Sequence, residues 1–169
     1  MDVFEAVRTV LAVREFDFRP VPADVIDRVV QSAHLSASSK NDQPWHFVVV
    51  EDRDTLRQLG EVATSGRYTA QAAFAVVVCY RHDSIFGVSD TSRAIQSMVL
   101  TAWEHGVGSN FVGFHGLDGV KPLLAIPDDV DVLAIIPFGY PAQPGGRGKK
   151  RRKPIGEVVH RGRFGVAWA

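Results

Sequence analysis

The sequence predicts a mixed fold of helices and strands, organised as a single domain of residues 1–169. Three observations lead to this prediction. Several segments carry apolar residues at helical spacing, other segments are short apolar runs rich in Val and Ile, and Pro or Gly stands between most of them. A chain of this length can bury about 70% of its unfolded surface, so it needs neither a metal nor a disulfide to fold.

Helices are expected wherever apolar residues follow the 3.6-residue period. Asp2 is placed to cap the first helix, which fades near Ala12, and Pro22 suits the first turn of the second. The longest helix is widely apolar, and Gly106 suits the left-handed residue just past its end. The expected helical ranges are 2–12, 22–34, 52–62, 90–105 and 117–124.

Strands are expected in three apolar runs, at residues 47–51, 75–80 and 132–141. The run Ala75–Tyr80 is apolar on both faces, which predicts a central strand in its sheet. Cys79 lies in this run and is the only cysteine, so it is expected to be a core residue rather than a catalytic one. Pro137 lies in the last run and indicates a bulge or an edge position, because proline lacks an N–H.

Composition and charge argue against several classes of protein. The formal net charge is zero, which disfavours a general nucleic-acid or membrane binder. No apolar run approaches the roughly 20 residues of a membrane span, and the N-terminus carries no signal pattern, so a cytoplasmic protein is expected. His82-Asp83 has no second ligand cluster, so no metal site is predicted. No Gly-x-Ser-x-Gly motif occurs, and no catalytic acid, base or nucleophile can be named.

The loop between the second predicted helix and the first predicted strand has an unusual composition. Residues 36–45 read Ser-Ala-Ser-Ser-Lys-Asn-Asp-Gln-Pro-Trp, which brings together small hydroxyl groups and amides. Pro44 favours an extended Gln43, and Trp45 gives the strand a large apolar anchor. A loop fixed at both ends with a polar centre suits ligand binding, although an ordinary well-capped turn is the alternative.

A strongly basic arm, residues 143–154, is the one break in composition. Its sequence from Pro144 is Pro-Gly-Gly-Arg-Gly-Lys-Lys-Arg-Arg-Lys-Pro. Three interpretations are open: a clamp over an anionic ligand, a solvated tail, and a nucleic-acid or localisation segment. Alternate residues of an extended segment point the same way, so Lys150 and Arg152 are able to converge on one phosphate.

Several of these stretches resemble the nitroreductase family of flavin enzymes. Residues 38–45 are similar to its Ser-Ser-x-Asn-x-Gln-Pro-Trp loop, which lies against FMN in the family. Residues 150–155 resemble its Lys-x-Arg-x-Pro-Leu segment, whose side chains bind the FMN phosphate. Val13–Phe16 matches the second half of its Arg-Arg-Ser/Thr-x-Arg-x-Phe motif, and residues 106–114 resemble the strand where a backbone group approaches the flavin. The resemblance runs from Val3 to Val159.

The resemblance implies a fold, an assembly and a set of binding residues. The fold is α+β, with a nitroreductase-like three-layer arrangement, a mostly antiparallel central sheet flanked by helices, and an intertwined homodimer. FMN then occupies two interface sites, each built from both chains. The FMN-binding residues carried over are Arg14, Ser38, Ser39, Asn41, Gln43, Gly113, Lys150 and Arg152. For Gly113, a glycine in a strand bulge is the alternative explanation.

The resemblance also implies an activity. NADH or NADPH reduces FMN, and the reduced flavin passes electrons to a nitroaromatic, a quinone or a similar small acceptor in a ping-pong mechanism. The cofactor supplies this chemistry, while the protein orients it. Arg14, near the pyrimidine edge by the same carry-over, would stabilise the negative charge of the reduced ring. The expected partners are a second copy of the chain and a small electron acceptor, without nucleic acid or membrane.

One departure from the family pattern favours an alternative function. Val10-Leu11-Ala12 stands where the family has Arg-Arg-Ser, and two lost hydrogen bonds to phosphate would weaken binding roughly 10²–10⁴-fold if nothing replaced them. Arg8 lies on the same helical face and is one candidate replacement, and the surplus charges of Lys149, Arg151 and Lys153 are others. The alternative is a family-related flavin or small-ligand binding protein with weakened or lost reductase activity.

Overall fold

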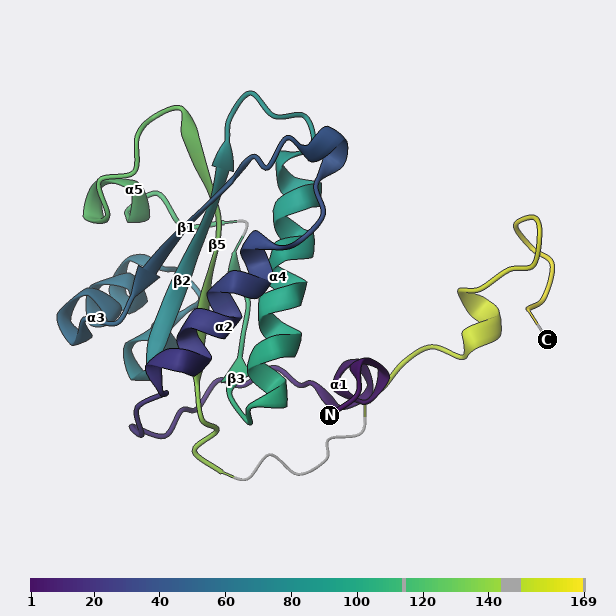
Figure 1. Cartoon of the computed structure of the whole chain (residues 1–169), viewed down its shortest axis with the longest axis horizontal. Coiled ribbons are helices and arrows are strands. Elements are labelled where there is room, and N and C mark those ends of the chain that lie inside the picture. Colours follow the sequence, from purple (N-terminus) through teal and green to yellow (C-terminus); the bar gives the residue numbers. More distant parts are fainter. Residues whose placement is uncertain (114, 144–149, 169) are drawn as a thin grey trace.

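The computed structural model describes residues 1–113, 115–143 and 150–168. Within these residues, five strands form one sheet in the order β1-β2-β5-β3, with β4 also paired to β5. All four strand pairs are antiparallel, as the α+β prediction requires (Figure 1). The strands are β1 (Trp45–Val50), β2 (Phe74–Arg81), β3 (Gly108–Ser109), β4 (Val112–Gly113) and β5 (Val130–Gly139).

Helices cover both faces of the sheet, which gives three layers (Figure 1). The helix α2 (Ala23–His34) and the long helix α4 (Gly87–Glu104) lie on one face, whereas α3 (Arg53–Val62) and α5 (Val120–Leu123) lie on the other. The helix α1 (Val3–Thr9) lies beside the C-terminal end of α4. Short 3-10 turns cover Ser39–Asn41, Arg67–Gln71 and Ile155–Glu157.

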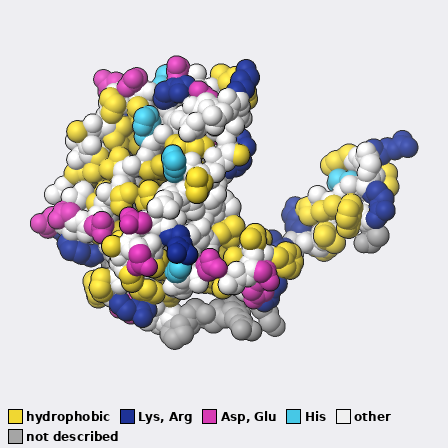
Figure 2. Space-filling model, viewed as in Figure 1, with side chains coloured by type: hydrophobic (Ala, Val, Ile, Leu, Met, Phe, Trp, Pro, Cys, Tyr) yellow, Lys and Arg dark blue, Asp and Glu magenta, His cyan; other side chains and the backbone are white. Residues whose placement is uncertain are grey.

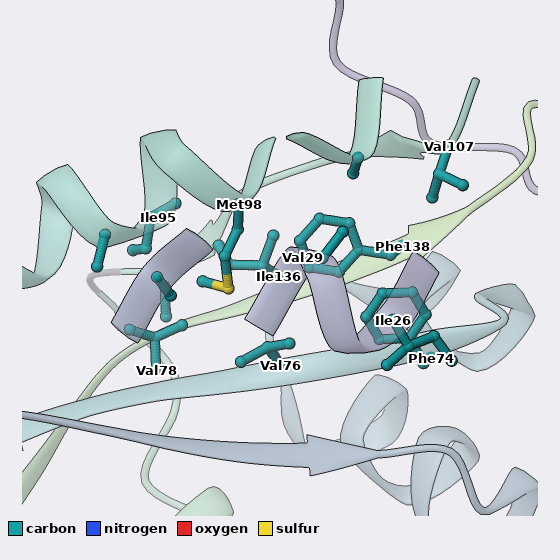
Figure 3. Close-up of a cluster of buried hydrophobic side chains, with 14 of the residues drawn as sticks. Ile26, Val29, Phe74, Val76, Val78, Ile95, Met98, Val107, Ile136 and Phe138 are labelled. Carbon is teal, nitrogen blue, oxygen red and sulfur yellow. The ribbon is translucent and has the colours of Figure 1, made fainter. Parts of the chain in front are cut away.

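The strand β2 is central, as its apolar pattern predicts. It pairs with β1 on one side and with β5 on the other. Because successive side chains of a strand point to opposite faces, β2 contributes to two cores. Phe74, Val76 and Val78 pack with α2 and α4, where the ring of Phe74 stacks on Phe138 of β5 at 4.8 Å between centroids (Figure 3). The second core lies under α3 and α5 and includes Cys79.

The burial of Cys79 makes a testable prediction. Burial raises the pKa of the Cys79 thiol to about 11, so about one thiol in a thousand is ionised at pH 8. Since the thiolate is the nucleophile, we expect the folded protein to resist an aromatic disulfide reagent at pH 8. In denaturant, the same reagent should label one thiol per chain. Rapid stoichiometric labelling of the folded protein would contradict this placement.

The first helix differs from its prediction. The expected helix reached Ala12, but α1 ends at Thr9, and Val10 is already extended with φ −55° and ψ 132°. The reason lies far along the chain. Ala12 forms a parallel bridge with Ser109, and the N–H of Val13 donates to the Ser109 carbonyl at 2.8 Å. Backbone groups at Ala12 and Val13 that a longer helix would use are therefore bonded to Ser109 at the edge of the sheet.

Most other boundaries follow the predictions closely, although α4 begins at Gly87, three residues before the expected Asp90. Asp2 and Asp52 cap α1 and α3 through their carboxylates, and Gly106 follows α4 with φ +73°. The expected helix at 117–124 is shorter, because α5 covers only Val120–Leu123. Pro137 is not on an edge strand, since β5 has neighbours on both sides. It lies where the facing chain is interrupted between β3 and β4, a position that tolerates the missing N–H.

The C-terminal segment 150–168 begins beside α1 and then leaves the body of the molecule, so that its later part stands away from it (Figure 1). It carries exposed apolar side chains together with arginines (Figure 2). The predicted basic arm at 143–154 lies partly outside the described residues, which omit 144–149. Across the described part of the chain, no helix is long and apolar enough to cross a membrane.

Candidate functional site

The signature loop, residues Ser36–Pro44, connects α2 to β1 in a strongly bent conformation. Three of its residues that are not glycine have positive φ: Lys40 at 55°, Asn41 at 58° and Gln43 at 49°. The hydroxyl of Ser38 accepts a hydrogen bond from the Gln43 N–H at 3.0 Å. The Gln43 amide in turn donates to the Asn41 side chain at 3.2 Å. The loop therefore presents exposed amide groups on a backbone that its own side chains cross-link.

Contacts with the body of the protein fix both sides of this loop. Ser39 bonds to the carboxylate of Asp90 through its N–H and its hydroxyl. Asp42 accepts hydrogen bonds from Arg81 at 3.1 Å and from Ser84 at 3.1 Å. The Arg81 hydrogen bond lowers the pKa of the Asp42 carboxyl, so this anchor stays ionised near neutral pH. After the loop, Trp45 is buried as the apolar anchor that the sequence predicts.

A second group of predicted residues lies at a cavity of about 400 Å³ beside α1. Lys150 and Arg152 both line it, together with the apolar stretch Val10–Ala12. The Lys150 ammonium donates to the carbonyl of Val7 near the end of α1. Burial, and then the charge of Arg152, lower the pKa of Lys150. Residues from α4, from the β3–β4 region and from β5 complete the wall: Ile95, Gln96, Val99, Ser109, Asn110, Phe111 and Ile136.

Two cations at one cavity are a chemically suitable end for a phosphate, because charge-assisted bonds to phosphate are the strong ones. The Val10–Ala12 stretch of the cavity wall is apolar where the family motif is basic and hydroxylic. Arg8 does not line this cavity, and its guanidinium bonds to Glu5 at 2.7 and 2.8 Å. The structure therefore gives no support to Arg8 as the replacement for the missing arginines.

Arg14 and Gly113, two further residues predicted to bind FMN, do not line this cavity. Arg14 interacts with the hydroxyl of Tyr68, which also accepts a hydrogen bond from the Asn110 amide at 2.9 Å. Burial raises the pKa of Tyr68, and the nearby Arg14 partly opposes this shift. Gly113 pairs with Ala134 of β5, and a Cβ there would lie 2.5 Å from the Phe111 ring and 3.0 Å from the Leu133 carbonyl. A side chain at Gly113 would thus clash with its own surroundings.

The predicted residues therefore form separate groups within one chain. Ser38, Ser39, Asn41 and Gln43 lie together in the signature loop, which contacts the first turn of α4. Lys150 and Arg152 lie together at the cavity, which meets α4 further along, at Ile95–Val99. No loop residue lines that cavity. Within one chain, therefore, no single cavity joins the two groups.

Sequence reasoning missed the residues that support these groups. Asp90 was expected only as the start of the longest helix, whereas it is a buried partner of the loop. Tyr68 had no predicted role, whereas its hydroxyl links Asn110 and Arg14. A buried Asp and a paired Tyr give no periodic signal, so only the tertiary contacts find them.

The fold and the sequence both match known proteins. A Methanothermobacter thermautotrophicus protein that carries the provisional name NADH dehydrogenase/NAD(P)H nitroreductase is 36% identical over 158 residues, covering 87% of this chain and 82% of that protein. The Bacillus subtilis protein named FMN reductase (NADPH) is 28% identical, covering 98% and 75%. A solved Parabacteroides distasonis structure with the same provisional name as the first relative has a TM-score of 0.87 at 27% identity, covering 95% and 98%. The sequence model of the nitroreductase family matches residues 8–83 and 70–140, and this chain belongs to that family.

Proposed function

We propose that this protein is an FMN-dependent oxidoreductase that takes electrons from NADH or NADPH and passes them to a small acceptor such as a nitroaromatic or a quinone. The pair of cations at the α1 cavity carries this proposal, because Lys150 and Arg152 meet there as a phosphate site requires. Membership of the nitroreductase family and the name of the Bacillus subtilis relative support the choice of flavin and donor.

The donor set of the chain fits FMN in its chemistry. Lys150 and Arg152 would hold the phosphate, and the hydroxyl and amide groups of the signature loop would bind the polar edge of the ring. Arg14 and the backbone at Gly113 would face the ring, where the positive charge of Arg14 favours a reduced, anionic flavin. The loop residues assigned in this way are Ser38, Ser39, Asn41 and Gln43. Bound FMN supplies the redox chemistry itself, and the protein binds it, orients it and excludes water.

The working unit of this proposal is a homodimer in which the whole chain, residues 1–169, acts as one domain. Two observations support a second copy as the partner. The loop and the cation pair do not share a cavity within one chain. In addition, apolar side chains of α1 and of the C-terminal segment are exposed in the single chain (Figure 2). Large exposed apolar patches are typical of surfaces that bind another protein chain. We further propose a cytoplasmic location, where NADH and NADPH are available as donors.

The test is the colour and reactivity of the purified protein. We expect a yellow preparation, or a colourless one that quenches the fluorescence of added FMN. We then expect the flavin absorption band to bleach when NADH or NADPH is added without oxygen, and to return with a quinone or nitroaromatic. A protein that neither carries nor binds FMN would overturn the proposal.

One observation favours a second candidate, a flavin-binding protein without efficient reductase activity. Val10, Leu11 and Ala12 contribute apolar wall to the cavity, where the family motif would supply donors for phosphate. The two candidates differ in one measurement. A binding protein would retain FMN, yet its absorption band would not bleach with either nicotinamide donor.

A further inference from the structure

A buried carboxylate lies beneath the signature loop, on the first turn of α4. Asp90 has no solvent exposure. Its Oδ2 accepts a hydrogen bond from the Ser39 N–H at 2.8 Å, and its Oδ1 accepts one from the Ser39 hydroxyl at 3.1 Å. A buried carboxylate is costly unless its oxygens are paired. These bonds therefore tie the loop and the helix to each other.

Arg93 completes the cluster from the solvent side. Its guanidinium donates to Oδ1 of Asp90 and reaches the Ser39 hydroxyl at 3.4 Å. The Arg93 side chain is 49% exposed, whereas the Asp90 side chain is fully buried. Arg93 thus covers the carboxylate and balances its charge, while Asp90 makes the contacts that reach the loop backbone.

The loop requires such an anchor because its backbone is strained. Lys40, Asn41 and Gln43 all have positive φ, a conformation that residues other than glycine adopt at an energetic cost. Residues in such conformations persist only where surrounding contacts determine them. The Asp42–Arg81 contact holds the far side of the loop, and the Asp90–Ser39 contact holds the near side.

We propose that Asp90, supported by Arg93, is a positioning residue that sets the geometry of the FMN-binding loop. This inference rests on the proposed function for its ligand, but its structural part concerns the loop alone. Asp90 is buried beneath Ser39, so it acts through Ser39 and not by touching the flavin. When the anchor is lost, the strained residues relax and the exposed amides of Asn41 and Gln43 lose their fixed positions.

The experiment combines limited proteolysis with FMN binding on the full chain. In Asp90→Asn, the shape is kept, but one acceptor oxygen becomes an N–H donor that faces other donors. We expect trypsin to cleave this variant after Lys40 roughly tenfold faster than the wild type, or more, as expected for loss of a bond to a charged group. The digestion is done without FMN, and mass spectrometry follows the cleavage. We expect the dissociation constant of FMN to rise by a similar factor. Asp24→Asn is the matched control, because Asp24 is exposed in the first turn of α2, at the end of that helix that lies away from the loop.

Cleavage after Arg57, inside α3, is the internal reference for global unfolding. Faster cleavage after Lys40 with unchanged cleavage after Arg57, together with weaker FMN binding, supports the proposal. Equal acceleration at both sites, unchanged cleavage after Lys40, or unchanged FMN affinity overturns it. If Asp90→Asn does not fold, Arg93→Gln on the exposed side of the cluster is judged by the same criteria. Wild-type protein that binds no FMN would instead refute the proposed function, while the Lys40 cleavage would still test the anchor.

Discussion

The double variant Lys150→Ala/Arg152→Ala is expected to bind FMN roughly 10²- to 10⁴-fold more weakly than the wild type. Both side chains line the α1 cavity, and the apolar wall formed by Val10–Ala12 offers no side-chain donor in their place. A hydrogen bond to a charged group contributes about 1.5–3 kcal/mol, and two such bonds to phosphate account for the expected range. Titration of FMN into the flavin-free protein, followed by quenching of flavin fluorescence, measures the effect.

Two controls make this result specific to the phosphate. Riboflavin lacks the phosphate, so its affinity for the double variant should stay close to that of the wild type. Arg8→Ala removes a cation of α1 that bonds to Glu5 and does not line the cavity, and it should leave FMN binding unchanged. If Arg8→Ala weakened FMN binding and the double variant did not, Arg8 would be the phosphate ligand after all.

Much of the fold could be predicted because its signals are local. The apolar residues of α2 recur at helical spacing, and the same residues are buried against the sheet. The apolar run at β2 predicts burial on both faces, and Val76 and Val77 are indeed buried in opposite cores. Asp2 could be recognised as a cap because an aspartate just before a helical pattern is placed to bond to an N–H three residues on.

The remaining features depend on contacts between distant residues. The end of α1 is fixed by the bond between Val13 and Ser109, which no local pattern reveals. The anchor of the signature loop is an aspartate that sequence periodicity would place on an ordinary helix start. A loop motif therefore indicates which residues face a ligand, whereas the residues that hold the loop are visible only in the folded chain.

The exposed face of α1 shows a further limit of sequence reasoning. Helical spacing predicts that Val3, Phe4 and Val7 share one side of a helix, but it does not say what covers them. In the single chain they are exposed to 77%, 75% and 45%. Side chains this apolar normally lie against other protein when they gather in one place. The proposed dimer accounts for them and makes the role of Phe4 testable.

Phe4→Glu is expected to raise the dissociation constant of the homodimer roughly 10³- to 10⁴-fold. Burial of a Phe side chain contributes about 1.5–3 kcal/mol. A two-fold symmetric dimer contains the substitution in both chains, so the loss of association free energy is counted twice. A glutamate buried without a partner adds a further cost. Sedimentation velocity across a range of protein concentrations measures the change. Phe18→Glu is the matched control, because Phe18 is an equally exposed phenylalanine, at 81%, that lies outside both α1 and the C-terminal segment.

The same variant tests whether the FMN site is shared between chains. Phe4 does not line the cavity of Lys150 and Arg152, so its replacement leaves the cations in place. If the signature loop of one chain and the cations of the other bind one flavin, the monomeric variant should lose most of its FMN affinity. The affinity should recover at protein concentrations high enough to restore the dimer. A monomer that binds FMN as tightly as the wild type would confine the site to a single chain and would remove the reason for a shared site.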